Sequence, residues 1–173
     1  MLPRSIPVLL IAALSLLVPS AFAQGAALER VVIGEALQEK EDEYGARDLR
    51  RLREDLREAV SEALARDGLL AGNDAGDLVI TLTLEDAWPN RPTFAQMSDQ
   101  PGLSYRSVSR GGARLSAVIE TADGRQVGGA DYEWRTFDIA DSAHRSTWSD
   151  ARRTFDRFAR RLADEADGAR PAG

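Results

Sequence analysis

The sequence contains no cysteine and only one histidine, His144, and these two shortages restrict its chemistry. Without cysteine there is no disulfide framework, no thiolate metal site and no thiol to carry a lipid anchor. A single histidine leaves little for a zinc site. We therefore expect the chain to be held together by its apolar core alone, which its 173 residues make feasible for one domain.

Lysine is almost absent as well, because Lys40 stands alone among the 22 basic residues. The acidic residues number 28, and the formal net charge is −6. An acidic chain is a poor partner for nucleic acid or for an anionic membrane surface, so we expect neither. We interpret the excess of arginine over lysine as the codon preference of a GC-rich bacterial genome.

The first 23 residues contain an apolar run that is too short to span a membrane. Arg4 precedes an apolar run over residues 8–18, interrupted only by Ser15, and Ala21-Phe22-Ala23 has the small-x-small pattern that a signal peptidase recognises. The run has about ten residues, against about twenty in a transmembrane helix. We predict a signal peptide cleaved after Ala23, export to the periplasm and no permanent membrane anchor. The alternative is a buried N-terminal helix.

Two helices are predicted from apolar stripes with helical spacing. The first spans residues 48–66 and ends before Gly68, and its charged face is expected to lie in solvent. Oppositely charged residues stand four apart on that face, as in the pair Arg51 and Asp55, and are expected to form ion pairs. The second helix is expected to start at Thr147, with the threonine hydroxyl as its cap.

Four strands are predicted from alternating or β-branched patterns. They span residues 28–35, 77–88, 115–119 and 127–137. Asp123-Gly124 between the last two is a hairpin signal. Two amphipathic helices can cover only one face of four strands. We predict an α+β two-layer sandwich, with a mostly antiparallel sheet, two helices on one face and the order β-α-β-β-β-α. The domain is expected to span residues 24–167, before a disordered tail at 168–173.

Residues 86–112 fit neither pattern and are the candidate binding segment. Loops of this length are uncommon in compact domains and are usually functional or disordered. Its three prolines favour order, and its aromatic side chains are expected to anchor it on the sheet. A partner or ligand surface is predicted from Trp88, Arg91, Phe94, Tyr105, Arg106 and Arg110. The alternative is a segment that only packs over the open face of the sheet.

Catalytic and metal motifs are nearly absent. His144 lies near Asp138 and several serines, but there is no nucleophile elbow, and neighbours on one loop seldom form a catalytic triad. Glu85 and Asp86 carry oxygen ligands for calcium, but without the spacing of an EF-hand loop. We predict no enzymatic activity, no cofactor and no metal. A hydrolase centred on His144 is the weakest of the functions considered.

The order of the predicted elements resembles a recurrent class of envelope domains. Val31-Val32-Ile33-Gly34 leads into a charged helix that ends at Gly68, and a strand follows at residues 78–84. This resembles the small α/β modules of periplasmic accessory proteins and lipoproteins, such as the amino-terminal domain of TolB and related uncharacterised families. The chain departs from the lipoprotein members in lacking the acylated cysteine, and the resemblance includes no diagnostic motif, so no functional residue is transferred.

The resemblance implies a non-catalytic module that docks onto a protein or cell-wall partner of the envelope. The alternative is an envelope protein that binds a small anionic ligand through residues 86–112.

Overall fold

The computed structural model describes residues 25–71, 76–139 and 145–170. Its elements are β1 (Ala26–Ile33), α1 (Glu35–Gln38), α2 (Glu41–Tyr44), α3 (Ala46–Arg66), β2 (Leu78–Trp88), α4 (Phe94–Asp99), β3 (Gly112–Thr121), β4 (Gln126–Arg135) and α5 (Ser149–Gly168). The predicted signal peptide, His144 and residues 171–173 lie outside the described residues. None of the described helices has the length and apolarity needed to cross a membrane.

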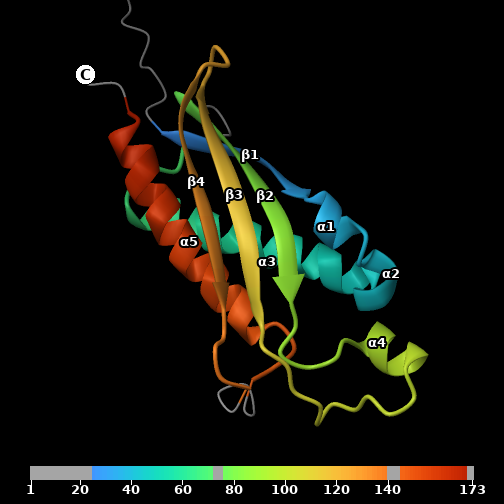
Figure 1. Ribbon diagram of the computed structural model, residues 1–173. Helices are drawn as coiled ribbons and strands as arrows, with labels where there is room; N and C mark the ends of the chain where they lie inside the picture. Colours follow the sequence, from blue (N-terminus) through green and yellow to red (C-terminus); the bar gives the residue numbers. More distant parts are fainter. Residues whose placement is uncertain (1–24, 72–75, 140–144, 171–173) are drawn as a thin grey trace, which may run out of the picture.

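The four strands form one mixed sheet in the order β1-β2-β3-β4. β1 pairs with β2 in parallel, whereas β2 with β3 and β3 with β4 are antiparallel. The long helices α3 and α5 lie side by side and cover one face of the sheet (Figure 1). The predicted α+β two-layer sandwich, with a mostly antiparallel sheet and two helices on one face, is therefore confirmed.

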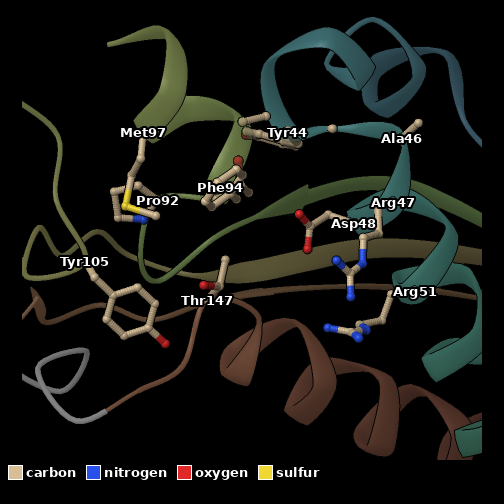
Figure 2. Close-up of a pocket in the computed structure, with 13 residues that line it drawn as sticks. Tyr44, Ala46, Arg47, Asp48, Arg51, Pro92, Phe94, Met97, Tyr105 and Thr147 are labelled. Atoms are coloured by element: carbon tan, nitrogen blue, oxygen red, sulfur yellow. The ribbon is translucent and has the colours of Figure 1, made fainter. Parts of the chain in front are cut away.

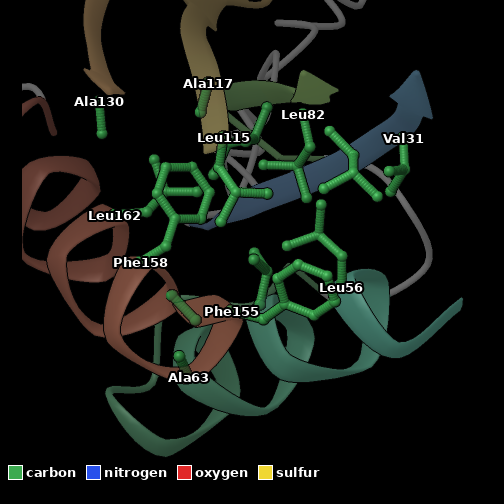
Figure 3. Packing of buried hydrophobic residues seen from close by; sticks show 14 of the residues in the cluster. Val31, Leu56, Ala63, Leu82, Leu115, Ala117, Ala130, Phe155, Phe158 and Leu162 are labelled. Carbon is green, nitrogen blue, oxygen red and sulfur yellow. The ribbon is translucent and has the colours of Figure 1, made fainter. Parts of the chain in front are cut away.

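The core lies between the two long helices and the sheet (Figure 3). Each of its largest side chains is at most 1% exposed, and they come from both layers: Phe155 and Phe158 on α5, Leu56 on α3, Leu82 on β2 and Leu115 on β3. Along β2 the alternate residues Thr81 and Thr83 are half-buried on the uncovered face. The period of two predicted from the sequence thus decides which side chains meet the helices.

The predicted hairpin between β3 and β4 is present. Gly124 has φ of 84°, a left-handed conformation that glycine adopts without strain. The Thr121 N–H donates to the carbonyl of Arg125 at 2.9 Å and closes the turn. The Thr121 hydroxyl donates to Asp123, and this hydrogen bond lowers the pKa of the Asp123 carboxyl. Asp-Gly at this position therefore has the local role that the sequence predicts.

The start of α5 differs from the prediction. Trp148, not Thr147, occupies the N-cap position, and no side chain caps the helix. The Ser149 side-chain oxygen accepts a hydrogen bond from the Ser146 N–H at 2.8 Å, which stabilises the preceding turn. Asp150 in the first turn is fully buried. The prediction of a Thr147 cap was wrong because the chain enters α5 through a turn that buries the tryptophan.

The ion pair predicted on the outer face of α3 is also replaced. Asp55 accepts a hydrogen bond from Arg152 Nε at 2.8 Å and so bridges α3 to α5. In the described part of the chain, no salt bridge joins Asp55 to Arg51. The prediction was wrong because the packing of α5 against α3 brings a closer partner than the next turn of the same helix.

Candidate partner-binding site

Residues 86–112 contain more regular structure than the sequence pattern predicts. β2 continues to Trp88, β3 begins at Gly112, and the short helix α4 lies between them, beyond the carboxyl end of β2 (Figure 1). A capping box starts α4: Thr93 Oγ1 accepts from the Gln96 N–H at 3.2 Å, and Gln96 Oε1 accepts from the Thr93 N–H at 3.0 Å. The Thr-x-x-Gln spacing was a readable signal for this helix, but α4 is too short for an apolar stripe to mark it.

A buried polar junction, formed by Asn90, Thr136 and Asp150, holds this end of the molecule together. Asn90 and Asp150 are 0% exposed and Thr136 is 4% exposed. Asn90 Nδ2 donates to Asp150 Oδ2 at 2.6 Å, and the Asp150 N–H donates back to Asn90 Oδ1 at 2.9 Å. The Thr136 hydroxyl donates to the same Oδ2. The junction therefore ties the chain after β2 and the chain after β4 to the first turn of α5.

The buried charge of Asp150 has two cationic neighbours. Asp150 Oδ1 lies 3.4 Å from Arg145 Nη1 and 3.8 Å from Arg153 Nη1. A buried carboxylate without such neighbours would be strongly unfavourable. Space around the junction is tight, because a Cβ atom added at Gly111 would lie 2.4 Å from Asn90 Oδ1. Only glycine fits there while the Asn90 amide keeps its hydrogen bonds.

Arg91 holds the chain on both sides of it. Its Nε donates to the Arg145 carbonyl at 2.6 Å, and its Nη1 donates to the Tyr105 carbonyl at 2.5 Å. The guanidinium carbon also lies 5.4 Å from the centre of the Tyr105 ring. Arg91 is one of the predicted binding cations, but the structure uses its planar set of donors to fix residues 105 and 145. We regard it as a positioning residue.

An open cavity of about 560 Å³, here called the α3–α4 cleft, lies beside α4 (Figure 2). One wall is the start of α3 and the other is α4 with the chain around it. The side chains that define these walls are Arg47, Asp48 and Arg51 on α3, and Phe94, Met97 and Tyr105 opposite. The cleft therefore has a charged wall that faces an apolar and aromatic one.

Two aromatic residues of the binding segment, Phe94 and Tyr105, do not anchor it on the sheet. Phe94 is 80% exposed and Tyr105 is 57% exposed. The prediction of aromatic anchors was wrong for these two residues, because the Thr93 cap and the Arg91 hydrogen bonds hold the segment in their place. Both rings are consequently left at the surface, on the cleft.

At the base of the cleft, Tyr44 is packed against Trp148. Tyr44 is 5% exposed and meets the Trp148 ring edge to face, with ring centres 5.5 Å apart. Trp148 Nε1 donates to Asp48 Oδ1 at 3.0 Å. Burial raises the pKa of Tyr44 to about 12, and the negative charges of Glu43 and Asp86 add to the effect. The tyrosine therefore remains neutral throughout the physiological range of pH.

Trp88 belongs to a different environment, on the uncovered face of the sheet. The Arg135 guanidinium carbon lies 4.2 Å from the centre of the Trp88 ring, and Lys40 Nζ lies 5.9 Å from it. Lys40 also pairs with the buried Asp86 at 2.6 Å. The one lysine of the chain is thus engaged in a mixed ionic and aromatic cluster, which accounts for Trp88 without a ligand.

The remaining predicted residues do not join the cleft. Arg110 lines a second cavity of about 400 Å³, together with Arg135 and the 89% exposed Phe137. Arg106 is exposed and lines neither cavity. Of the six predicted binding residues, the structure therefore brings only Phe94 and Tyr105 together in the α3–α4 cleft. The sequence pattern does not indicate a binding role for Arg47 and Arg51, because an exposed charged helix face has no local sign of a site.

The described residues contain no group of three or more histidine, aspartate or glutamate side chains that could hold a metal ion. In the acidic pair considered for calcium, Asp86 accepts from Lys40, and Glu85 Oε1 accepts from the Ser116 hydroxyl at 2.6 Å. His144, the centre of the hydrolase alternative, lies outside the described residues.

No protein-family model matches this chain, and no curated protein matches it in sequence. Among solved structures, a candidate lipoprotein from Caulobacter crescentus is similar over 84% of this chain and 93% of its own, with 18% identity and a TM-score of 0.42. A minor lipoprotein from Acinetobacter baumannii is similar over 88% and 98%, with 13% identity and a TM-score of 0.38. A Xanthomonas campestris protein of the DUF330 family is similar over 83% of each chain, with 14% identity and a TM-score of 0.34. None of the three is close enough to place the chain in a family.

Proposed function

We propose that this protein is a non-enzymatic interaction module of the cell envelope, and that it docks onto a partner protein through the α3–α4 cleft. The observation that carries the proposal is the exposure of Phe94, at 80%, on a helix fixed by a capping box. Binding hot spots are enriched in aromatic residues that fill a partner's pockets. A surface that is already held in place loses less conformational entropy on binding.

The structure around Phe94 supports a docking role more than a loop that only covers the sheet. The buried polar junction and Arg91 hold the segment with directional hydrogen bonds, yet the two aromatic rings remain in contact with solvent. A covering loop would instead place those rings against the sheet, where they would bury apolar area. The location in the envelope rests on the predicted signal peptide and on the resemblance in element order to periplasmic modules such as the amino-terminal domain of TolB.

The alternative of a small anionic ligand held by Arg91, Arg106 and Arg110 has less support. Arg91 donates to two backbone carbonyls, and Arg110 lies in another cavity. A thermal-shift screen of small carboxylates and phosphates distinguishes the two functions, because a ligand that binds the native state raises the melting temperature with concentration. We expect no such shift.

Photo-cross-linking in cells tests the docking function directly. With a photo-reactive amino acid in place of Phe94, we expect a discrete adduct with one envelope protein. The matched control is position 70, because Leu70 is also apolar and 41% exposed but lies beside the start of β1, at the opposite end of the sheet. Equal adducts at both positions would contradict the proposal. Adducts with peptidoglycan alone would mean that the partner is the cell wall and not a protein.

A further inference from the structure

We infer that the α3–α4 cleft recognises an acidic segment of its partner protein in which a carboxylate lies next to an aromatic or large apolar side chain. This inference rests on the proposed docking function and adds the chemistry of the partner. It combines the two walls of the cleft, one that supplies arginine donors and one that supplies apolar contact.

The charged wall is formed by Arg47 and Arg51, which stand four residues apart and therefore on the same side of α3. Both side chains are exposed and extend from the helix into the cleft (Figure 2). In the part of the chain that the structure describes, no salt bridge involves either of them. Two arginines one turn apart are well placed to bind one carboxylate or two neighbouring ones, since guanidinium donors match carboxylate oxygens in geometry.

Tertiary packing creates this excess of positive charge. In an isolated helix, Asp55 would neutralise Arg51 from the next turn. In the folded protein Asp55 is engaged by Arg152 of α5 at 2.8 Å, and Arg51 loses its local partner. The positive charge at the cleft is thus a consequence of how α5 packs against α3.

Asp48 is the only acidic side chain among the described residues that line the cleft. Its Oδ1 already accepts the Trp148 Nε1 hydrogen at 3.0 Å. Two arginines and one aspartate leave this wall with a positive balance, although the whole chain has a net charge of −6. An acidic partner is therefore repelled by the protein in general and attracted at this wall, which selects both its docking position and its orientation.

The opposite wall of the cleft accounts for the aromatic or large apolar side chain of the recognised segment. Phe94 and Tyr105 present aromatic rings, and Met97 on the same wall has a flexible, polarisable side chain that adapts to different apolar shapes. The volume of about 560 Å³ falls within the roughly 300–1,000 Å³ of pockets that hold drug-sized groups. The cleft thus has room for one large side chain and its neighbours from an extended segment.

The test uses fluorescence anisotropy with three labelled peptides that differ only at the positions flanking a central phenylalanine. These positions carry aspartate, asparagine or lysine. We expect the purified protein to bind the aspartate peptide, more weakly as salt is raised. We expect the asparagine peptide to bind at least about tenfold more weakly, a difference of ~1.4 kcal/mol. The lysine peptide is expected not to bind.

A matched pair of charge reversals places this binding in the cleft. The double variant Arg47→Glu, Arg51→Glu is expected to bind the aspartate peptide at least about tenfold more weakly. Arg50→Glu with Arg53→Glu makes the same charge change on the same helix, at exposed positions outside the cleft, and is expected to leave binding within about twofold. Circular dichroism and urea midpoints confirm that both variants fold.

Three results would overturn the inference: no binding of the aspartate peptide at millimolar concentration, equal binding of the asparagine peptide, or equal loss in the two charge-reversed variants. The cross-link at position 94 separates these failures from failure of the docking function. A partner adduct that persists unchanged in the Arg47→Glu, Arg51→Glu background would preserve docking and refute the acidic recognition. Loss of that adduct in this background, with retention in the control, supports both.

Discussion

The helix-covered side of the sheet and the end that carries α4 are held together by different interactions. On the covered side, Phe155, Phe158 and the leucines around them are almost completely buried, and no polar partner determines their positions. At the α4 end, Asn90 and Asp150 are just as buried but are joined by hydrogen bonds of 2.6 and 2.9 Å. Both regions exclude water. Only at the α4 end do directional hydrogen bonds fix the relative positions of individual atoms.

This difference indicates that the two regions have different roles, one in stability and the other in positioning the α4 segment. Apolar burial contributes about 25 cal/mol per Å² and depends little on direction, so it supplies most of the stability. A hydrogen bond contributes only about 1 kcal/mol net, but leaving a buried donor or acceptor without a partner is costly. The polar junction therefore contributes less to stability than the core and more to the fixed position of the segment that presents Phe94 and Tyr105.

Phe158→Ala is expected to have the largest effect on stability. Phe158 is 0% exposed, and truncation of a buried phenylalanine costs about 4 kcal/mol through lost burial and the cavity left behind. Urea unfolding measures the loss, and both regions should unfold together. Val118→Ala, at a 36% exposed position on the open face, is the control and should cost less than about 1 kcal/mol. A similar loss in both variants would show that burial does not distinguish the two positions.

Asp150→Ala is expected to cost about 3 kcal/mol, because the donors of Asn90 and Thr136 lose their acceptor. Asp150→Asn keeps one acceptor oxygen and should lose less. Urea unfolding gives the stability, and limited proteolysis reports whether residues 89–111 open before the core. If Asp150→Ala were as stable as the unmodified protein, the junction would have no role in holding this segment.

A pH dependence should appear at the base of the cleft. The pKa of Tyr44 is about 12 in the folded protein, against the ordinary tyrosine pKa of 10.0 in the unfolded chain. Since the unfolded chain releases this proton first, Tyr44 contributes stability below pH 10 that is lost as pH rises towards 12. Urea unfolding at several alkaline pH values should show a steeper decline than in Tyr44→Phe. Tyr105→Phe is the exposed control and should retain the decline of the unmodified protein.

Arg91→Ala is expected to have the smallest effect of the four on stability, about 1 kcal/mol, because its partners are carbonyls near the surface. Its local effect should be clear: hydrogen exchange around residue 105 is expected to accelerate while exchange in β2 and β3 is unchanged. Arg91→Lys should not restore protection, because one ammonium cannot reproduce the planar set of guanidinium donors. Uniform acceleration across the sheet would mean that the α4 end and the core are not separate units.

The core was more predictable from the sequence than the site. The apolar periodicity of α3 and α5 and the alternation in β2 are local patterns, and each indicates which face is buried. The site depends on contacts between distant residues: Asn90 meets Asp150 from 60 positions away, and Trp148 meets Asp48 from 100 positions away. Such pairs have no local sign, so Arg91 was interpreted as a free cation and Arg51 as the partner of Asp55.

The sequence by itself determined the type of each long element, the faces that are buried and the Asp-Gly hairpin, because these follow from the conformational preferences and spacing of neighbouring residues. Tertiary structure alone decided that Asp55 binds Arg152, that Arg91 holds backbone carbonyls, and that Arg47 and Arg51 face Phe94 across a cleft. The physical reason is that a charged or polar side chain takes the best partner that the folded chain brings within reach, and only the complete fold determines which partners those are.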